Sequence, residues 1–339
     1  MKVRFGFVAM STLLEDASPS KTMTYKTFSK LADREAAVRR LVSIAEQNLH
    51  NTLRILKHST AHDIQMYRLS SKLIPLATHD ELQDWKPYAA LQQAFKELGD
   101  FVLKKRMRAS FHPDHFCVFS TPRPEVLINS KKDLIHHVVM LETMGLDERF
   151  KCNIHIGGAY GDKESSGLRF IEQFSALSPR YKHRVTLEND DKTFNVKETL
   201  AAAEATGVPM VLDIHHHMVN PGDLDADELH QVIWPRISAT WERERNRLGL
   251  SSEEQLPPKI HASSPKSITN LRGHADYVEP LPLLEFLLEA ARTTEYLDCM
   301  LEAKSKDSAL LQLMEDMREL AGRDERIRIV DGASIEINN

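Results

Sequence analysis

Short apolar runs of strand length recur along the chain, and each is followed by a longer segment in which apolar residues have helical spacing. We predict strands over 3–9, 66–70, 108–112, 152–157, 184–189, 209–214, 258–263 and 297–303. We predict helices over 34–58, 87–106, 130–145, 165–176, 196–206, 226–247, 282–292 and 307–322. Eight such alternations are typical of a closed (β/α)8 barrel, although a doubly wound open sheet produces a similar pattern.

Polar residues near the strand ends distinguish between these two folds. Imidazoles and carboxylates lie toward the C-terminal end of six predicted strands: His112, His155, Glu188, Asp213, His261 and Glu302. In a barrel these ends converge on one mouth, whereas in an open sheet most of them would be spread along an edge. We therefore predict an α/β fold, a TIM (β/α)8 barrel, as a single domain over residues 1–322.

The regions outside the regular alternation carry two further predictions. The stretch RIRIVDGASIEI, 326–337, alternates around an Asp-Gly pair, which is a type I′ hairpin signal. We expect 323–339 to be a C-terminal tail that forms a β-hairpin. The long loops 11–29 and 113–129 follow strands, so they should lie on the active face of the barrel.

Composition narrows the class of protein. The chain has 339 residues, of which 42% are hydrophobic, and its first apolar run is too short for a signal peptide or a membrane span. We expect a cytoplasmic protein with no membrane association. Three widely separated cysteines argue against a disulfide framework. A net charge of −5 argues against nucleic-acid binding, unless divalent cations in a carboxylate-rich site reverse the local sign.

The donor set at the strand ends predicts a metal centre. It combines imidazoles and carboxylates without thiolates, which suits Mn²⁺, Zn²⁺, Mg²⁺ or Fe²⁺. One ion cannot use so many ligands, so a cluster of two or three ions is implied. Clustered divalent ions polarise phosphoryl oxygens and activate water, and sugar isomerases of this fold also use two ions. Phosphodiester hydrolysis and aldose–ketose isomerisation therefore remain, together with a non-catalytic metal-binding barrel.

Nine short motifs, in order along nearly the whole chain, resemble those of the UV damage endonuclease family, which is related in fold to the abasic-site endonuclease IV. They are RFGF (4–7), YRLSSKLIP (67–75), SFHPDHF (110–116), NIHIGG (153–158), TLEND (186–190), LDIHHH (212–217), KIHASSP (259–265), RGHADYV (272–278) and MLEAKSKD (300–307). The resemblance implies a DNA repair endonuclease that recognises cyclobutane pyrimidine dimers and (6-4) photoproducts in duplex DNA. It would hydrolyse the phosphodiester 5′ to the lesion, and we expect it to act as a monomer.

The resemblance also implies a cluster of three divalent ions, with manganese as the usual metal. Its ligands would be His79, His112, His155, Glu188, Asp213, His216, His261, His274 and Glu302, with Lys259 at a position where the family has a carboxylated lysine. Catalysis would depend on Lys259, Glu188, Glu302 and His216. Lys259 and His261 are two residues apart on a strand, so both can face the metals, and a carbamate would be an anionic ligand.

The LDIHHH motif gives two conflicting predictions. Strand alternation from Asp213 selects His215 and His217, because residues two apart face the same way. The family resemblance instead selects Asp213 and His216. The two agree only if the chain leaves strand geometry near residue 214, so that residues three apart converge on the metals.

Lesion contacts are expected in the long loops on the active face. The resemblance places a wedge into the DNA helix at His115 and Phe116, where His115 departs from the family's usual Gln. Tyr25 and Lys26 are expected to touch DNA. An abasic-site endonuclease of the endonuclease IV type and a metal-dependent sugar isomerase remain as alternatives, and incision of a dimer-containing duplex against an abasic duplex separates the two nucleases.

Overall fold

Eight parallel strands form a closed barrel in the computed structural model, which describes residues 1–114 and 117–338. They are β1 (Lys2–Val8), β2 (Met66–Arg68), β3 (Arg108–Phe111), β4 (Lys151–His155), β5 (Val185–Glu188), β6 (Met210–Asp213), β7 (Lys259–Ala262) and β10 (Tyr296–Leu301). Each pairs with its neighbour in this order, and β10 pairs with β1 to close the ring. The predicted TIM barrel is therefore confirmed, and the open-sheet alternative is excluded.

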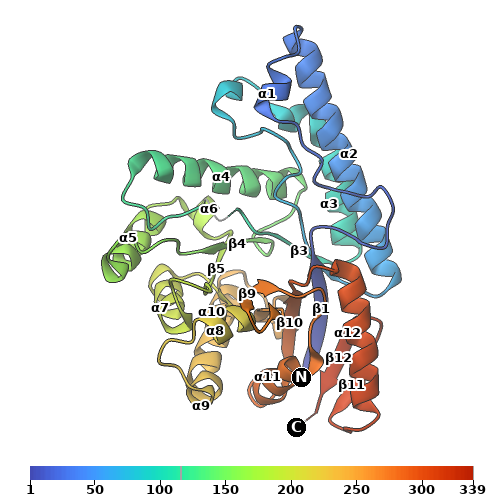
Figure 1. Cartoon of the computed structure of the whole chain (residues 1–339), viewed down its shortest axis with the longest axis vertical. Helices are drawn as coiled ribbons and strands as arrows, with labels where there is room; N and C mark the ends of the chain where they lie inside the picture. Colours follow the sequence, from blue (N-terminus) through green and yellow to red (C-terminus); the bar gives the residue numbers. More distant parts are fainter. Residues whose placement is uncertain (115–116, 339) are drawn as a thin grey trace.

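Helices surround the barrel and connect its strands (Figure 1). The longer ones are α2 (Arg34–Ala61), α3 (Pro87–Lys104), α4 (Pro124–Thr143), α5 (Lys163–Ser175), α7 (Val196–Thr206), α10 (Trp234–Arg247), α11 (Pro280–Ala290) and α12 (Lys306–Ala321). The short ones are α1 (Tyr25–Phe28), α6 (Pro179–Lys182), α8 (Ile214–Val219), α9 (Ala226–Glu228), η1 (Asp80–Leu82), the π-helical η2 (Leu229–Ile233) and η3 (Glu253–Gln255). No helix in the described part of the chain is long and apolar enough to cross a membrane.

The base of the barrel interior contains ion pairs around one buried carboxylate. Asp298 is fully buried, and both its carboxylate oxygens accept hydrogen bonds from Arg4 at 2.7 and 3.0 Å, while Arg108 donates to it at 2.6 Å. Val8 and Met300 belong to a separate small apolar cluster. Residues two apart on a strand face the same side. Met300 therefore separates the buried ion pairs of Asp298 from Glu302 at the strand's other end.

The C-terminal residues form a hairpin that joins the barrel sheet. It consists of β11 (Ile327–Ile329) and β12 (Ser334–Ile337), as the alternating pattern predicted. Its loop is longer than the two-residue type I′ turn expected from Asp331-Gly332, because the Asp331 carboxylate accepts the amide of Ala333 at 2.9 Å and holds a wider turn. β12 pairs antiparallel with Lys2–Arg4 of β1, while β2 pairs with the end of β1, Gly6–Val8. The two chain ends therefore lie side by side (Figure 1).

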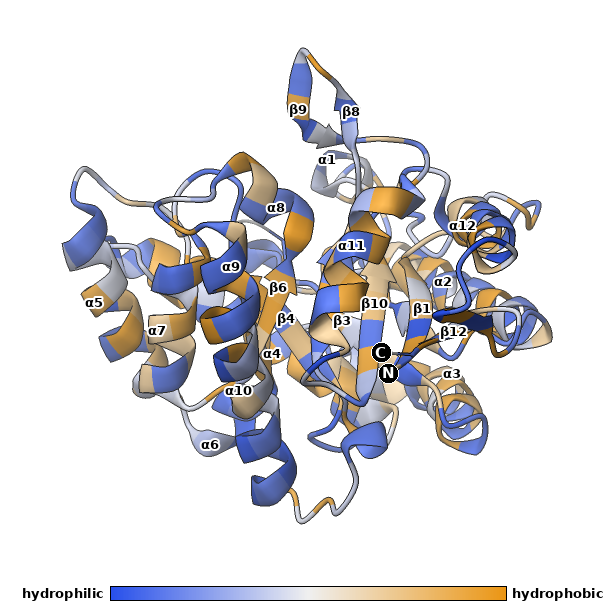
Figure 2. Cartoon of the chain, turned by 90° about the horizontal axis from the view of Figure 1, so that it is seen from below, coloured by the Kyte–Doolittle hydropathy of each residue, from blue (hydrophilic) through white to orange (hydrophobic). Residues whose placement is uncertain are grey.

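A second hairpin was not predicted. It follows β7 and consists of β8 (Pro265–Ser267) and β9 (Asn270–His274), paired antiparallel. Figure 2 shows it projecting from the body of the molecule, and residues 266–272 are all exposed. Because it buries no face, neither an apolar run nor a clear alternation marks it in the sequence.

Candidate metal centre

Side chains from six neighbouring strand ends meet at the C-terminal mouth of the barrel. They come from β3 through β7 and from β10: His112, His155, Glu188, Asp213, His261 and Glu302. The pairing register places His155 opposite Glu188, and Asp213 opposite His261. The polar strand ends, which favoured the barrel over an open sheet, thus lie around one site.

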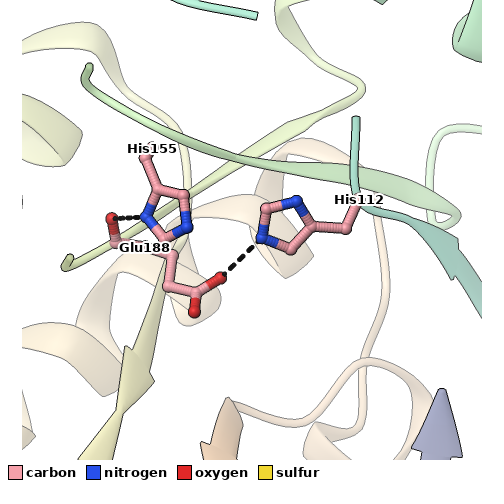
Figure 3. Close-up of side chains that lie close together, drawn as sticks. All are labelled: His112, His155 and Glu188. Carbon is pink, nitrogen blue, oxygen red and sulfur yellow. Dashed lines mark hydrogen bonds and ion pairs between the residues drawn. The ribbon is translucent and has the colours of Figure 1, made fainter. Parts of the chain in front are cut away.

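Glu188 is the centre of this arrangement. Two groups have ligand atoms that all lie within 4.8 Å of one another: His112, His155 and Glu188, and Glu188, Asp213, His261 and Glu302. One Glu188 oxygen lies 3.2 Å from Nε2 of His112 (Figure 3). The other lies 3.2 Å from Nδ1 of His261. A carboxylate shared by two such groups could supply an oxygen to each of two ions.

Asp213 and His216 are brought together by the start of a helix. The chain leaves strand geometry at Ile214, where α8 begins, and Oδ1 of Asp213 accepts the amide of His216 at 2.7 Å as its N-cap. Nδ1 of His216 lies 3.4 Å from Oε1 of Glu188. Residues three apart therefore converge, and the alternation that selected His215 and His217 stops at Asp213.

The other two histidines of this motif lie elsewhere. His215 is buried, with Nδ1 2.5 Å from Oγ of Ser263 and Nε2 donating to the carbonyl of Leu271 at 2.6 Å. His217 lines a separate pocket together with His230. His215 thus contacts Ser263 and the backbone of Leu271 and not the two ligand groups. His217 faces a different pocket, so strand alternation did not identify the histidine that lies beside Glu188.

Buried polar atoms at the mouth fit a bound cation. Oε1 of Glu188, Oδ2 of Asp213 and both ring nitrogens of His261 form no hydrogen bond with any described residue, although carboxylates approach Nδ1 of His261 closely. Leaving a buried polar atom without a partner costs about 1–3 kcal/mol. Divalent ions would take lone pairs from the two carboxylate oxygens and from one ring nitrogen of His261, so the residues present fit the predicted group.

The electrostatics also favour cations. Burial raises the pKa of Asp213 to about 7, His216 opposes the rise, and the charges of Glu188 and Glu302 add to it. Burial would lower the pKa of His216, but the carboxylates of Asp213, Glu188 and Glu302 outweigh burial and raise it to about 9. Without ions, protons neutralise part of this negative charge. Divalent ions can replace those protons.

Two polar residues that the sequence did not single out hold the carboxylates. The amide of Asn153 donates to Oε2 of Glu188, and Arg68 pairs with Oε1 of Glu302. Asn153 lies two residues before His155 on β4, so both face the interior. The two-residue spacing from His155 was the only sequence signal that could have identified Asn153. Arg68 had no such signal, because its partner Glu302 lies far away in the sequence.

Lys259 lies deeper in the barrel, on the same face of β7 as His261. Its side chain is buried, and its Nζ donates to Oγ of Ser110 at 3.2 Å. Burial, followed by the charges of Arg108 and Arg68, lowers its pKa to about 7. A substantial fraction of this lysine is therefore an uncharged amine near neutral pH.

A cavity of about 610 Å³ opens onto this site. It is lined by four of the predicted histidine ligands, His112, His155, His216 and His274, and by Lys192 and Arg272 among others. His274 reaches it from β9, and its Nδ1 lies 2.8 Å from Oγ of Ser263. The hairpin that carries His274 thus forms one wall of the cavity.

The remaining predicted residues lie apart from these groups or outside the described residues. Nδ1 of His79 accepts the amide of Glu81, and its ring stacks on Tyr25 with centroids 4.3 Å apart. His79 belongs to neither described ligand group, so its assignment as a ligand stays a prediction, as does DNA contact by Tyr25 and Lys26. His115 and Phe116 lie outside the described residues.

Comparisons with known protein families and sequences identify the family of this chain. A family model described as UV-endonuclease UvdE matches residues 3–336. The UV DNA damage endonuclease of Bacillus velezensis is 44% identical over 322 residues, covering 95% of this chain and 96% of that protein. The one from Halalkalibacterium halodurans is 40% identical over 339 residues and covers both chains completely.

Among solved structures, the crystal structure of SacUVDE is similar, with a TM-score of 0.76 and 27% sequence identity. The similarity covers 94% of this chain and 99% of the SacUVDE chain. The family model covers nearly the whole chain and the curated relatives match almost their full length, so the chain belongs to the UV-endonuclease UvdE family.

Proposed function

We propose that this protein is a UV DNA damage endonuclease that cuts duplex DNA on the 5′ side of cyclobutane pyrimidine dimers and (6-4) photoproducts. The observation that carries the proposal is the position of Glu188, which is shared by two ligand groups at the barrel mouth. Family membership supports the class of enzyme, and the relatives' names supply the damaged DNA substrate.

The proposed cofactor is a cluster of three Mn²⁺ ions. Glu188, Asp213, His261 and Glu302 would hold one part of it, and His112 and His155 another. His79, His216, His274 and a modified Lys259 would be the further ligands. When bound, such ions supply Lewis-acid polarisation of the phosphate and lower the pKa of water. A nuclease built this way needs no nucleophilic side chain.

The protein's own contribution is to fix the ligands. Asn153 and Arg68 hold the carboxylates of Glu188 and Glu302, so neither ligand is free to rotate away. Asp213 fixes the backbone that presents His216. Because these contacts already hold the ligand atoms in place, the site needs no rearrangement when negative charge builds up on the phosphate during the reaction.

Lys259 is proposed to be carboxylated. Its uncharged amine would attack CO2, form a carbon–nitrogen bond and release a proton, which gives a carbamate anion. The guanidinium groups of Arg68 and Arg108, which lower the pKa of the amine, would stabilise that anion. Because Lys259 shares a face with His261, the carbamate would extend toward the same site.

An incision assay tests the function. Duplexes of one sequence, carrying a single cyclobutane dimer, a (6-4) photoproduct, an abasic site or no lesion, would be incubated with the protein after EDTA treatment and again after addition of Mn²⁺. We expect cutting 5′ to both photoproducts only after Mn²⁺ is restored. Cutting of the abasic duplex alone would overturn the proposal in favour of an abasic-site endonuclease.

A further inference from the structure

The β8–β9 hairpin exposes apolar side chains beside the candidate metal centre. Ile268 is 93% exposed, the highest value among the exposed large hydrophobic residues of the described chain, and Leu271 is 51% exposed. The hairpin projects beyond the neighbouring elements (Figure 2). Isolated exposed apolar residues are common on proteins, but these two lie together on an arm that contributes no buried face.

The tip of the hairpin is a two-residue turn. Ser267 pairs with Asn270, so Ile268 and Thr269 form the tip. Neither tip residue has a positive φ, and the hydroxyl of Thr269 contacts Oγ of Ser267 at 3.1 Å. The turn itself therefore does not require an apolar side chain at Ile268, which is almost fully exposed.

Three polar contacts hold the arm in a fixed position relative to the metal ligands. The carbonyl of Leu271 accepts the Nε2 hydrogen of His215 at 2.6 Å, and Nε of Arg272 pairs with Asp191 at 2.6 Å. At the base, His274 contacts Oγ of Ser263 at 2.8 Å. These contacts link β9 to α8, to the loop after β5 and to the end of β7, so the arm is positioned from three sides.

The positive charge of the β8–β9 hairpin favours binding of a polyanion. Residues 265–274 include Lys266 and Arg272 but no carboxylate, although the whole chain has a net charge of −5. Lys266 is exposed and forms no ion pair with any described residue. Arg272 and His274 also line the 610 Å³ cavity shared with His112 and His155. A strand of nucleic acid bound at those histidines would lie within reach of the arm.

We propose that the β8–β9 hairpin is a DNA-contacting arm, in which Ile268 packs against bases beside the lesion and Lys266 contacts a backbone phosphate. This inference rests on the proposed function, because it takes the substrate to be damaged duplex DNA. Apolar side chains are known to wedge into weakened base steps, and two-stranded ribbons fit DNA grooves. The arm would then contribute to lesion preference through Ile268 and to general affinity through Lys266.

Binding measurements on single variants test the arm. Fluorescence anisotropy would give the Kd of Ile268→Ser and Lys266→Ala for a labelled duplex with one cyclobutane dimer and for the undamaged duplex, at several salt concentrations. Leu168→Ser, at a side chain that is 63% exposed on α5, and Lys104→Ala, at the end of α3, serve as matched controls. Thermal melting and bound-metal content would show that each variant folds and retains its ions.

We expect Ile268→Ser to weaken binding of the damaged duplex about tenfold and to lower the ratio of damaged to undamaged affinity, as loss of an apolar base contact should. Lys266→Ala should weaken both duplexes alike and reduce the salt slope by about one unit. Wild-type affinity and salt slope in both variants would overturn the proposal. A wild-type dimer that Ile268→Ser converts to a monomer would assign the tip to a contact between copies instead. Failure of the wild-type protein to bind or cut damaged DNA would overturn the proposed function itself.

Discussion

Oδ1 of Asp213 accepts the backbone amide of His216 at 2.7 Å, so the residue that ends a barrel strand also caps the helix that carries His216. Its second oxygen, Oδ2, is buried and forms no hydrogen bond with the described residues. The two oxygens thus have separate roles, since one fixes the backbone and the other remains available to an ion.

The histidine motif can be tested by single substitutions. His216→Ala should abolish incision and reduce the number of bound ions, because it removes a side chain beside Glu188. His217→Ala should leave both unchanged, since His217 lines another pocket. His215→Ala should retain cutting but lower the free energy of unfolding by about 1–3 kcal/mol, because its buried partners lose their hydrogen bonds. Loss of bound metal with His215→Ala but not with His216→Ala would contradict this assignment.

The carboxylates should be essential for chemistry but not for folding. Glu188→Gln and Glu302→Gln keep the side-chain size and remove an anionic donor, so each should slow single-turnover incision by about a thousandfold. Circular dichroism and DNA-binding affinity should remain close to wild type. Normal incision by both variants in Mn²⁺ would eliminate the metal-cluster mechanism.

Metal removal should lower thermal stability. Glu188, Asp213 and Glu302 bring negative charge together in a buried site, and ions that bind only the folded state stabilise it by about 2.7 kcal/mol at a concentration one hundred times Kd. Calorimetry should show a lower Tm after EDTA treatment and recovery with Mn²⁺. The recovery should shrink in Glu188→Gln, and an identical Tm with and without ions in the wild-type protein would speak against a resident cluster.

Carboxylation of Lys259 should be visible by mass. Native mass spectrometry of protein kept in bicarbonate should show the added mass of one CO2, and acid should remove it. Lys259→Ala should lose at least about tenfold in metal affinity or incision rate, as expected when a group supporting a metal site is removed. If the wild-type protein shows no adduct and its activity does not respond to bicarbonate, then Lys259 acts as an amine.

The base of the barrel gives a prediction on stability and pH. Burial would raise the pKa of Asp298, but Arg4 and Arg108 outweigh burial and lower it. A lowered carboxyl pKa stabilises the fold above the unfolded value of about 3.9, and this stabilisation is lost as the pH falls through the folded value. Asp298→Asn leaves two buried guanidinium groups without their carboxylate, so it should cost about 3–5 kcal/mol at neutral pH.

Urea unfolding of metal-free protein from pH 7 to pH 3 would measure this cost. The difference between wild type and Asp298→Asn should be largest near neutral pH and should shrink in acid. Asp84→Asn removes an exposed partner of Arg34 and serves as the control, with stability unchanged. A difference that does not vary with pH would show that packing, and not charge, explains the loss.

The barrel could be predicted from the sequence because each strand is buried on both faces. Such strands read as continuous apolar runs, and the imidazole or carboxylate at the end of six of them marks the mouth. The first residues of the helices were harder to predict than the strands. α4 begins at Pro124, earlier than predicted, because Pro fits the first helical turn. The apolar run 126–128 belongs to this helix, but the polar residues 129–133 that follow the run interrupt its helical spacing.

The candidate ligands were easier to find in the sequence than the residues that hold them. Glu188 and His261 stand out because charged or imidazole side chains rarely lie at the end of a buried strand, and the structure brings them together. Arg68 could not, because a single arginine after a short strand has many roles and its partner, Glu302, lies at the far end of the chain. The β8–β9 hairpin was missed because its residues are exposed and its turn lacks Gly or Asn.

The pairing of β12 with the first half of β1 has a consequence for biosynthesis. Lys2–Arg4 take their antiparallel partner from Ser334–Glu336 and not from β2, so this edge of the first strand stays open until residues 334–336 have left the ribosome. An open strand edge readily pairs with other chains. A nascent chain stalled before residue 334 would therefore expose an unpaired strand edge, and pairing with residues 334–336 keeps the folded barrel from associating with other chains through it.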